Sequence, residues 1–269
     1  MNGHGGPGTF PPAADAGKSY SHQGFKVTTR KLPILKAEPI EQMTAKLGIA
    51  VPEMIFGDNS VSIAHAASGW SINFNTFDAL DRVDKKGVSM LQVAHSKEWQ
   101  STRKEKHQGI TEVVKPFDWS YTTDYKGTLL SETHFFKSSS KAIPIELLKR
   151  QDPIRFYDEV MLYEDEMADN GITMLSCKIR VMPARLLLLC RFFMRLDNVL
   201  FRIRDTRLYV EFETGEVIRE YVAKEEGYES VRMKLASTRE DVLAQMRDPN
   251  AIAELLPVVT QRLEQLVPK

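Results

Sequence analysis

Residues 172–204 read ITMLSCKIRVMPARLLLLCRFFMRLDNVLFRIR, and this stretch decides the fold class. In its first part the apolar residues Leu175, Cys177 and Ile179 alternate with polar residues, a period of two that predicts a strand with one buried face. Arg185–Leu196 is apolar at most positions, as expected of a central strand that is covered on both faces. The stretch therefore predicts neighbouring strands in the interior of a sheet.

Further strands flank this stretch on both sides. Arg155–Asp165 is joined to Ile172–Met182 through Asn170-Gly171, a dipeptide that signals a hairpin because both turn residues must accept positive φ. Later segments alternate in the same way and have short polar connections. These strands are expected at Val199–Arg204, Arg207–Glu213 and Glu216–Val222, with turns at Asp205-Thr206 and Thr214-Gly215. Connections this short predict an antiparallel meander.

The two ends of the chain differ from this central part. Residues 1–24 are rich in Gly, Pro, Ala and Ser, which predicts a disordered tail before a single domain at 25–269. Strands and short helices are expected in the first part of the domain at Phe25–Leu32, Pro39–Leu47, Glu53–Asn75, Phe77–Val83 and Lys97–Lys106. Near the end, Ser237 and Glu240 form a capping-box pattern, and Pro249–Leu266 has apolar residues at helical spacing. The expected fold class is α+β, with helices packed against one antiparallel sheet.

The composition narrows the classes of function. The chain has 269 residues, and its 36 basic side chains balance 36 acidic ones, which argues against nucleic acid or membrane as the default partner. Cys177 and Cys190 lie in apolar segments and are expected to be reduced core thiols. The N-terminal segment lacks a signal-peptide pattern. We expect a soluble protein of the cytoplasm, with the nucleus as a second location, that is monomeric when free.

A search for catalytic motifs favours a protein that is not an enzyme. The sequence contains neither a Gly-rich phosphate loop nor a nucleophile elbow, and its six histidines are scattered, so neither a cofactor nor a metal is expected. The alternative is a hydrolase that uses an acidic cluster of Asp118, Asp124 and Asp165. Against this alternative, the acidic segment at 157–169 is expected to pair with a basic strand, which is an ordinary stabilising pattern.

The basic strands offer a candidate binding surface. Lys178 and Arg180 lie two residues apart, as do Arg202 and Arg204, so each pair is expected to project from one face of the sheet. With Arg207 and Tyr209 they form a candidate basic and aromatic face for carboxylates on an extended peptide, since Arg binds carboxylates bidentately. Salt bridges to the acidic strand are the competing interpretation. A scaffold for an unrelated peptide is a third.

Three segments resemble the TOR signalling pathway regulator-like (TIPRL) family. They are Pro52–Asn59, Lys115–Leu130, and Lys178–Pro183 continuing through Arg191–Phe193 to Asp205–Tyr209. The resemblance extends from about Phe25 to about Leu266. It implies a central antiparallel sheet with an N-terminal α/β region on one side and a cleft on the other, and C-terminal helices.

The resemblance also implies a function. Members of the family are non-catalytic regulators that bind the catalytic subunit of type 2A protein phosphatases, restrain its activity, and take part in TOR-linked signalling and in phosphatase biogenesis. The resemblance implies that their cleft accepts the acidic and aromatic C-terminal tail of the phosphatase. A basic sheet face would suit that ligand.

Four positions match residues that the family uses for phosphatase contact. By resemblance they are Asp78, Ile143, Ile203 and Asp205, although Phe77 and Pro144 depart from the family pattern and Ile203 stands where Met is common. Each has a structural alternative: Asp78 could cap a helix, the two Ile residues could be core, and Asp205 suits a tight turn. For Ile203 the alternation with Val199 and Phe201 favours the core.

Overall fold

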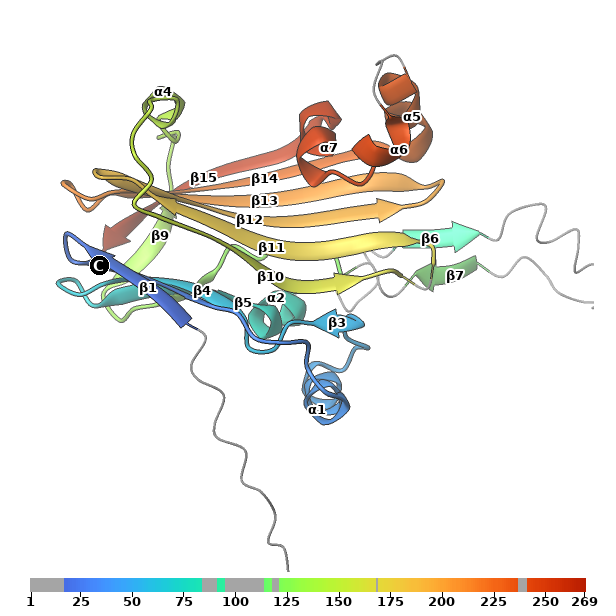
Figure 1. The fold of residues 1–269 in the computed structure, drawn as a ribbon, viewed down its shortest axis with the longest axis horizontal. Helices are drawn as coiled ribbons and strands as arrows, with labels where there is room; N and C mark the ends of the chain where they lie inside the picture. The colour runs from blue at the N-terminus through green and yellow to red at the C-terminus, as the bar shows by residue number, and fades with distance from the viewer. Residues whose placement is uncertain (1–16, 84–90, 95–113, 118–120, 168, 237–240) are drawn as a thin grey trace, which may run out of the picture.

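The structure is a computed structural model, and it describes residues 17–83, 91–94, 114–117, 121–167, 169–236 and 241–269. Its largest element is an eight-stranded antiparallel sheet in the order β3-β10-β11-β12-β13-β14-β15-β9 (Figure 1). The strands are β3 (Met54–Ile55), β9 (His134–Ser138), β10 (Phe156–Asp165), β11 (Gly171–Val181), β12 (Arg185–Leu196), β13 (Leu200–Glu211), β14 (Val217–Gly227) and β15 (Val258–Pro268). Strands β10 to β15 are consecutive neighbours, so the predicted meander is confirmed.

A smaller sheet of five strands lies against one face of the large sheet, in the order β1-β2-β4-β5-β8. Its strands are β1 (Gly17–His22), β2 (Phe25–Arg30), β4 (Ser60–His65), β5 (Trp70–Asn75) and β8 (Thr128–Leu130). The predicted disordered tail is wrong for residues 17–22, because β1 pairs with β2 from Gly17↔Arg30 to His22↔Phe25. Two further strands, β6 (Leu91–Ala94) and β7 (Val114–Phe117), pair with each other.

The hairpin between β10 and β11 was predicted, with one difference in detail. Met167 (φ 50°) and Asp169 (φ 63°) are in the left-handed region, while Gly171 has φ 155°. A Cβ atom at Gly171 would lie 1.9 Å from the carbonyl oxygen of Arg195, so only glycine fits here. The close approach of β12 therefore explains the glycine.

Two sequence predictions about later elements are wrong. The expected turn at Asp205-Thr206 is the middle of the continuous strand β13, where Asp205 pairs in register with Arg191 of β12. The helix expected over 249–266 ends early: α7 covers Pro249–Leu255, and β15 follows it. Pro257 explains the break, since proline disfavours the helical conformation in the residue before it, and Leu256 is extended (ψ 134°).

The other helices are short and lie on both sides of the large sheet. They are α1 (Ala37–Leu47), α2 (Thr76–Asp81), α4 (Ile145–Leu148), α5 (Tyr228–Ala236) and α6 (Val242–Gln245). Helix α1 ends at Gly48 (φ 69°), as predicted. The predicted helix at Lys97–Lys106 and the capping box at Ser237 and Glu240 lie outside the described residues. None of the helices in the described part of the chain is long and apolar enough to cross a membrane.

The large sheet is covered on one face and at both ends of the other, so the two-sided burial predicted for β12 is confirmed only in part. We call the face that packs on the smaller sheet the inner face; its core includes Leu188 and Phe192 with Ile63 and Phe74 of the smaller sheet. On the opposite, outer face, α5 to α7 cover one end and the α4 segment covers the other (Figure 1). The stretch of outer face between these two coverings is the candidate site. An α+β fold with a central antiparallel sheet is confirmed.

Candidate functional site

The strand register decides which side chains reach the outer face. Lys178 lies opposite Leu189, Leu189 opposite Arg207, and Arg207 opposite Glu220, so these four side chains form one row across β11 to β14. The next row contains Ser176, Arg191 and Asp205. Both rows run between α4 and α7.

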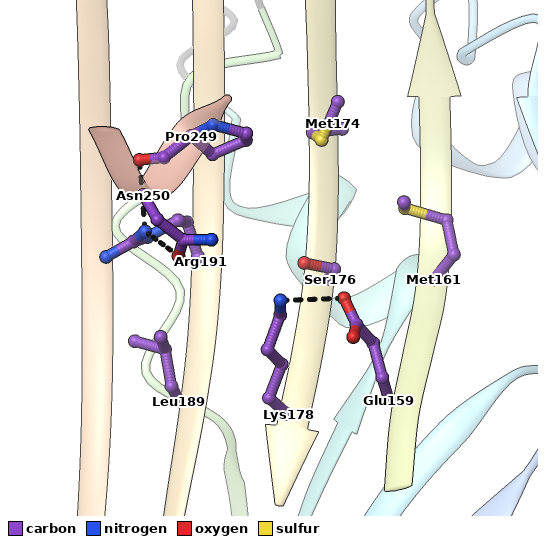
Figure 2. A pocket seen from close by; sticks show the side chains of 9 residues that line it. All are labelled: Glu159, Met161, Met174, Ser176, Lys178, Leu189, Arg191, Pro249 and Asn250. Carbon is purple, nitrogen blue, oxygen red and sulfur yellow. Dashed lines mark hydrogen bonds and ion pairs between the residues drawn. The ribbon is translucent and has the colours of Figure 1, made fainter. Parts of the chain in front are cut away.

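A hollow opens in these rows beside the first residues of α7, and its volume is about 130 Å³ (Figure 2). Its walls come from β10, β11, β12 and α7. The lining residues are Glu159, Met161, Met174, Ser176, Lys178, Leu189, Arg191, Pro249 and Asn250. We call this hollow, with the adjoining row through Arg207 and Glu220, the outer groove.

The exposed rim of the outer groove carries opposite charges. Lys178 Nζ lies 2.9 Å from Glu159 Oε1, and the two side chains are 36% and 45% exposed. Surface ion pairs of this kind contribute about 0–1 kcal/mol, so a ligand can replace one partner at little cost. The sequence left two interpretations of the basic residues: salt bridges to the acidic strand, or an accessible basic face. At Lys178 both hold, because the residue is paired and still exposed.

A buried ion pair forms the other wall. The guanidinium of Arg191 donates two hydrogen bonds to Asp205, each 2.7 Å long, and Asp205 is only 1% exposed. Arg191 Nη1 also donates to the carbonyl oxygen of Pro249 (3.1 Å) and to Asn250 Oδ1 (2.9 Å). The figure shows this guanidinium turned toward Asn250 (Figure 2). Arg191 thereby connects the sheet to the first turn of α7.

Apolar side chains form the rest of the hollow. Met161, Met174 and Leu189 line it from three adjacent strands, and all are partly exposed. Methionine adapts its shape to a ligand because its side chain is unbranched and polarizable. An apolar centre with a charged rim suits a peptide segment that carries both apolar and charged side chains.

The polar row continues from the hollow toward β15. Arg207 lies 3.4 Å from Asp205 Oδ2 and 3.1 Å from Glu220 Oε2, and Gln261 donates a 2.8 Å hydrogen bond to Glu220. Another open hollow of about 410 Å³ lies at the β15 and β9 edge, lined by Ser138, Ser139 and Gln261–Glu264. From Arg207 to Gln261, the outer face beside the apolar hollow is thus polar.

The predicted basic and aromatic face divides between the two sides of the sheet. Lys178, Arg180, Arg207 and Tyr209 belong to the outer face, as the register with Leu187 and Leu189 shows. Arg202 and Arg204 belong to the inner face. Because β13 continues without a turn, they have the opposite parity to Arg207 and Tyr209, so their inclusion in one face was wrong.

Internal partners occupy the two inner arginines. Arg202 Nε donates to Glu225 Oε2 (2.5 Å) and its Nη1 donates to Thr122 (2.8 Å), while Arg204 Nη2 donates to the same Glu225 oxygen (3.3 Å). Burial alone would raise the pKa of Glu225, but the hydrogen bonds and charges of Arg202 and Arg204 lower it overall. These arginines stabilise the inner layer of the fold.

Ile143 and Tyr209 lie at the α4 end of the outer face. Ile143 is buried and packs with Tyr209 and Ile218, and Tyr209 is itself buried and bonded to Glu211. Arg185 holds the segment in place through Leu147 O (3.2 Å) and Asp152 Oδ2 (3.1 Å). In this arrangement Ile143 anchors the α4 segment that borders the groove.

The remaining contact candidates are also engaged within the chain. Ile203 is 0% exposed beneath α5 to α7, in agreement with the core interpretation, and Asp205 lies beneath Arg191. Asp78 is in α2 on the inner side, where its carboxylate accepts hydrogen bonds from Asn75 (2.8 Å) and Thr128 (2.5 Å). Asn75 caps α2, and it does so by accepting from the Asp78 amide (2.9 Å). The four residues therefore do not form a single surface patch.

The acidic cluster of the hydrolase alternative does not gather at the groove. Asp118 lies outside the described residues, and Asp124 is exposed. Asp165 is buried and accepts hydrogen bonds from the backbone amides of Glu53 (2.9 Å) and Met167 (2.6 Å). Its charge is the main cause that raises the pKa of Glu53. Among the described residues, no group of three or more His, Cys, Asp and Glu side chains is placed to hold a metal ion.

Sequence reasoning missed most of the residues that line the hollow. Leu189 is part of the apolar run of β12 and Arg191 is a single interruption of it, while Met161 and Met174 resemble ordinary core residues. For Met174 the parity within β11 offered a signal, since Leu175 and Cys177 have the opposite parity and point inward. Asn250 had no local signal, because α7 reaches Arg191 only in the folded chain.

The model of the TIP41-like family matches residues 54–232, which include β3 to β14 and most of the outer groove. This chain belongs to the TIP41-like family. The resemblance predicted from three segments of the sequence is confirmed.

Several relatives of this TIP41-like chain cover about nine tenths of its length. TIP41-like proteins of Homo sapiens and Rattus norvegicus are 42% identical over 255 residues, which is 92% of this chain and 90% of theirs. The type 2A phosphatase activator TIP41 of Saccharomyces cerevisiae is 40% identical over 263 residues, 91% of this chain and 74% of its own. The type 2A phosphatase activator tip41 of Schizosaccharomyces pombe is 31% identical over 247 residues, 92% of this chain and 97% of its own.

Proposed function

We propose that this TIP41-like chain is a regulator of type 2A protein phosphatases that binds their catalytic subunit and performs no catalysis of its own. The observation that carries the proposal is the 40% identity to a yeast protein named type 2A phosphatase activator TIP41, along nine tenths of this chain. The geometry supports a binding role, since the outer groove is an open hollow on a rigid sheet. The proposed setting is TOR-linked signalling and phosphatase biogenesis, in the cytoplasm and nucleus.

The ligand that the groove fits best is the C-terminal tail of the catalytic subunit, bound in an extended conformation. An acidic residue of the tail would pair with Lys178 or Arg180, which lie on the same face and are partly exposed. An aromatic or aliphatic residue would enter the hollow against Met161, Met174 and Leu189. The α4 and α7 segments would border the tail on its two sides.

The direction of regulation is a separate element of the proposal. We propose that the bound chain restrains the catalytic subunit by occupying its surface, whereas the yeast and fission yeast relatives are named activators. An assay of phosphatase activity against a phosphopeptide, with increasing amounts of this protein, measures either outcome. A fall in activity at saturation is the expected result, and a rise would replace restraint by activation.

A charge-reversal experiment tests the groove. The double variant Lys178→Glu with Arg180→Glu is expected to weaken binding of purified catalytic subunit by at least about tenfold in calorimetry, since like charges would then face the acidic tail. The matched control is Lys18→Glu with Lys26→Glu, which reverses two exposed charges on β1 and β2 of the smaller sheet. The control is expected to bind like the wild type.

The outcomes separate the parts of the proposal. No complex between the wild-type protein and the catalytic subunit would overturn the function. Normal binding by the groove variant would show that the outer groove is not the binding site, while the catalytic subunit would still be the partner. A free tail peptide should compete with the subunit for the protein, and failure to compete would assign the groove to a different peptide.

A further inference from the structure

A second hollow of about 570 Å³ lies at the end of the two sheets where the C-terminus is found, far from α5 to α7 (Figure 1). Its walls come from the turn between β4 and β5, the turn between β13 and β14, the beginning of β9 and the end of β15. This volume is within the range of about 300–1,000 Å³ that is usual for sites of small molecules. The outer groove and this hollow share no lining residue.

Two histidines, His65 and His134, line this hollow. His65 Nδ1 lies 2.5 Å from the Ser68 hydroxyl, and its ring stacks on Phe25 with 4.3 Å between centroids. His134 Nδ1 lies 2.8 Å from the Thr133 hydroxyl. Within the part of the chain that the structure describes, neither Nε2 atom has a hydrogen-bond partner. Both rings are therefore oriented through one nitrogen and available through the other.

The other polar groups of the hollow leave an excess of donors. Glu216 is the carboxylate that lines it, and both of its oxygens are engaged: Lys141 Nζ lies 2.6 and 2.7 Å from them, and Gln265 donates a 2.8 Å hydrogen bond. The side chain of Lys141 is 55% exposed, so its ammonium also faces solvent. A cation would find no unpaired carboxylate among the described lining residues, whereas an anion would find several donors.

We infer that this hollow binds a small phosphate monoester, with the phosphate oxygens between the Nε2 atoms of His65 and His134 and within reach of Lys141. Protonated imidazoles form strong charge-assisted hydrogen bonds with phosphate oxygens. Leu266, Val267 and Pro268 line the same hollow and would contact an apolar organic group on the ester. This inference is independent of the phosphatase-binding function.

The charges around the histidines determine how binding depends on pH. Burial lowers the pKa of His65, and the neighbouring His134 lowers it further. An anion between the rings would offset that repulsion, so binding would raise the pKa of His65 and would strengthen as the pH falls. The charged or titratable groups that line the hollow are His65, His134, Lys141 and Glu216. On β1, His22 is held at the carbonyl oxygen of Pro183 (2.8 Å) instead.

Nuclear magnetic resonance of the imidazole protons in the full chain tests the inference without any mutation. Phenyl phosphate, at constant ionic strength, is expected to shift the His65 and His134 signals saturably and to raise the pKa of His65, while the His22 signal stays unchanged. Sulfate serves as a second probe because its charge is constant between about pH 6 and about pH 8. Its binding should weaken over that range. Inorganic phosphate separates free phosphate from its esters, since it lacks the apolar group.

The variants give a second readout. His65→Gln combined with His134→Gln is expected to weaken phenyl phosphate binding by about tenfold or more, and His22→Gln is expected to leave it unchanged. Three results would overturn the inference: no saturable shift at about pH 6, an equal shift of the His22 signal, or binding that survives the double variant. Tighter binding of inorganic phosphate than of phenyl phosphate would contradict the inference that the ligand is an ester whose organic group makes apolar contacts.

Discussion

Arg191 of β12 and Asp205 of β13 lie directly opposite each other and share two hydrogen bonds of 2.7 Å on the covered side of the outer groove. The carboxylate cannot reach a binding partner, because it is only 1% exposed. Any effect of Asp205 on binding would therefore act through Arg191 and the position of α7. This pair is the link between the stability of the fold and the shape of the groove.

Removal of one member of this pair is expected to be costly. Asp205→Ala should lower the free energy of unfolding by about 3–5 kcal/mol, because it leaves the Arg191 charge buried without its counter-ion. Urea unfolding followed by fluorescence measures the loss. The control is Glu146→Ala, whose ion pair with Lys149 is largely exposed and should contribute no more than about 1 kcal/mol. Asp205→Leu with Arg191→Met should recover most of the stability, and a loss as large as that of the single variant would contradict this account.

Ile203 is expected to act as a core residue. Ile203→Val should cost about 0.5–1.5 kcal/mol in unfolding free energy, because one methylene is removed from the cluster with Phe193 and Val231. The affinity of the folded variant for the phosphatase catalytic subunit should stay at the wild-type value in calorimetry. A tenfold weaker complex at unchanged stability would show that Ile203 is a direct contact.

Filling the hollow of the outer groove should block it. Leu189→Trp is expected to weaken binding of the phosphatase tail peptide by at least about tenfold, because the larger side chain takes the space of a peptide side chain. The matched control, Lys26→Trp, places the same side chain on the exposed β2 of the smaller sheet. Fluorescence anisotropy of a labelled peptide gives both affinities. Equal affinities for the two variants would place the peptide elsewhere.

Asp78 separates a structural role from a contact role. Asp78→Ala should lower the unfolding free energy by about 1–3 kcal/mol, because Thr128 and Asn75 lose their common acceptor. It should not change the affinity for the isolated tail peptide, because α2 and the groove lie on opposite sides of the large sheet (Figure 1). Binding of the whole catalytic subunit is the informative comparison. A loss for the subunit alone would add a second contact surface around α2.

Stability should fall in acid through Glu225. The folded-state pKa of Glu225 is below the ordinary value of 4.5, so the unfolded chain binds more protons as the pH falls through this range. Its contribution is present above about pH 4.5 and is lost as the pH drops to the folded-state pKa. Urea unfolding of wild type and Glu225→Gln at about pH 7 and about pH 3.5 measures this difference. The gap between the two proteins should shrink in acid, and a constant gap would assign the stabilisation to another group.

The sequence predicted the centre of the fold better than its ends. The alternation of Leu175, Cys177 and Ile179 and the apolar run of β12 identified the interior strands, because burial on one or both faces leaves a periodic pattern. The prediction for Pro249–Leu266 was wrong because the spacing of its apolar residues fits one long helix. The same spacing also fits the short helix α7 followed by the strand β15, which is what forms. Strand β15 is specified by hydrogen bonds to β14 and β9, which a local pattern does not contain.

The site was predicted only in part, for a related reason. Lys178 and Arg180 were identified as an outward pair, because parity within one strand is a local property. The predicted turn at Asp205-Thr206 placed Arg204 and Arg207 on one face of the sheet. In the continuous strand β13 they lie on opposite faces. The partner of Asp205 lies on another strand and the partner of Arg191 on α7, so the buried network depends on tertiary structure.

The position of β9 has a consequence for synthesis of the protein on the ribosome. β9 joins the large sheet through β15 alone, although β10 to β14 all lie between them in the chain. During translation, β9 therefore has no strand to pair with in that sheet until β10 to β14 and then β15 have been synthesised. Unpaired strands are sites of aggregation, so slow or interrupted translation over this interval would be a specific hazard for the protein.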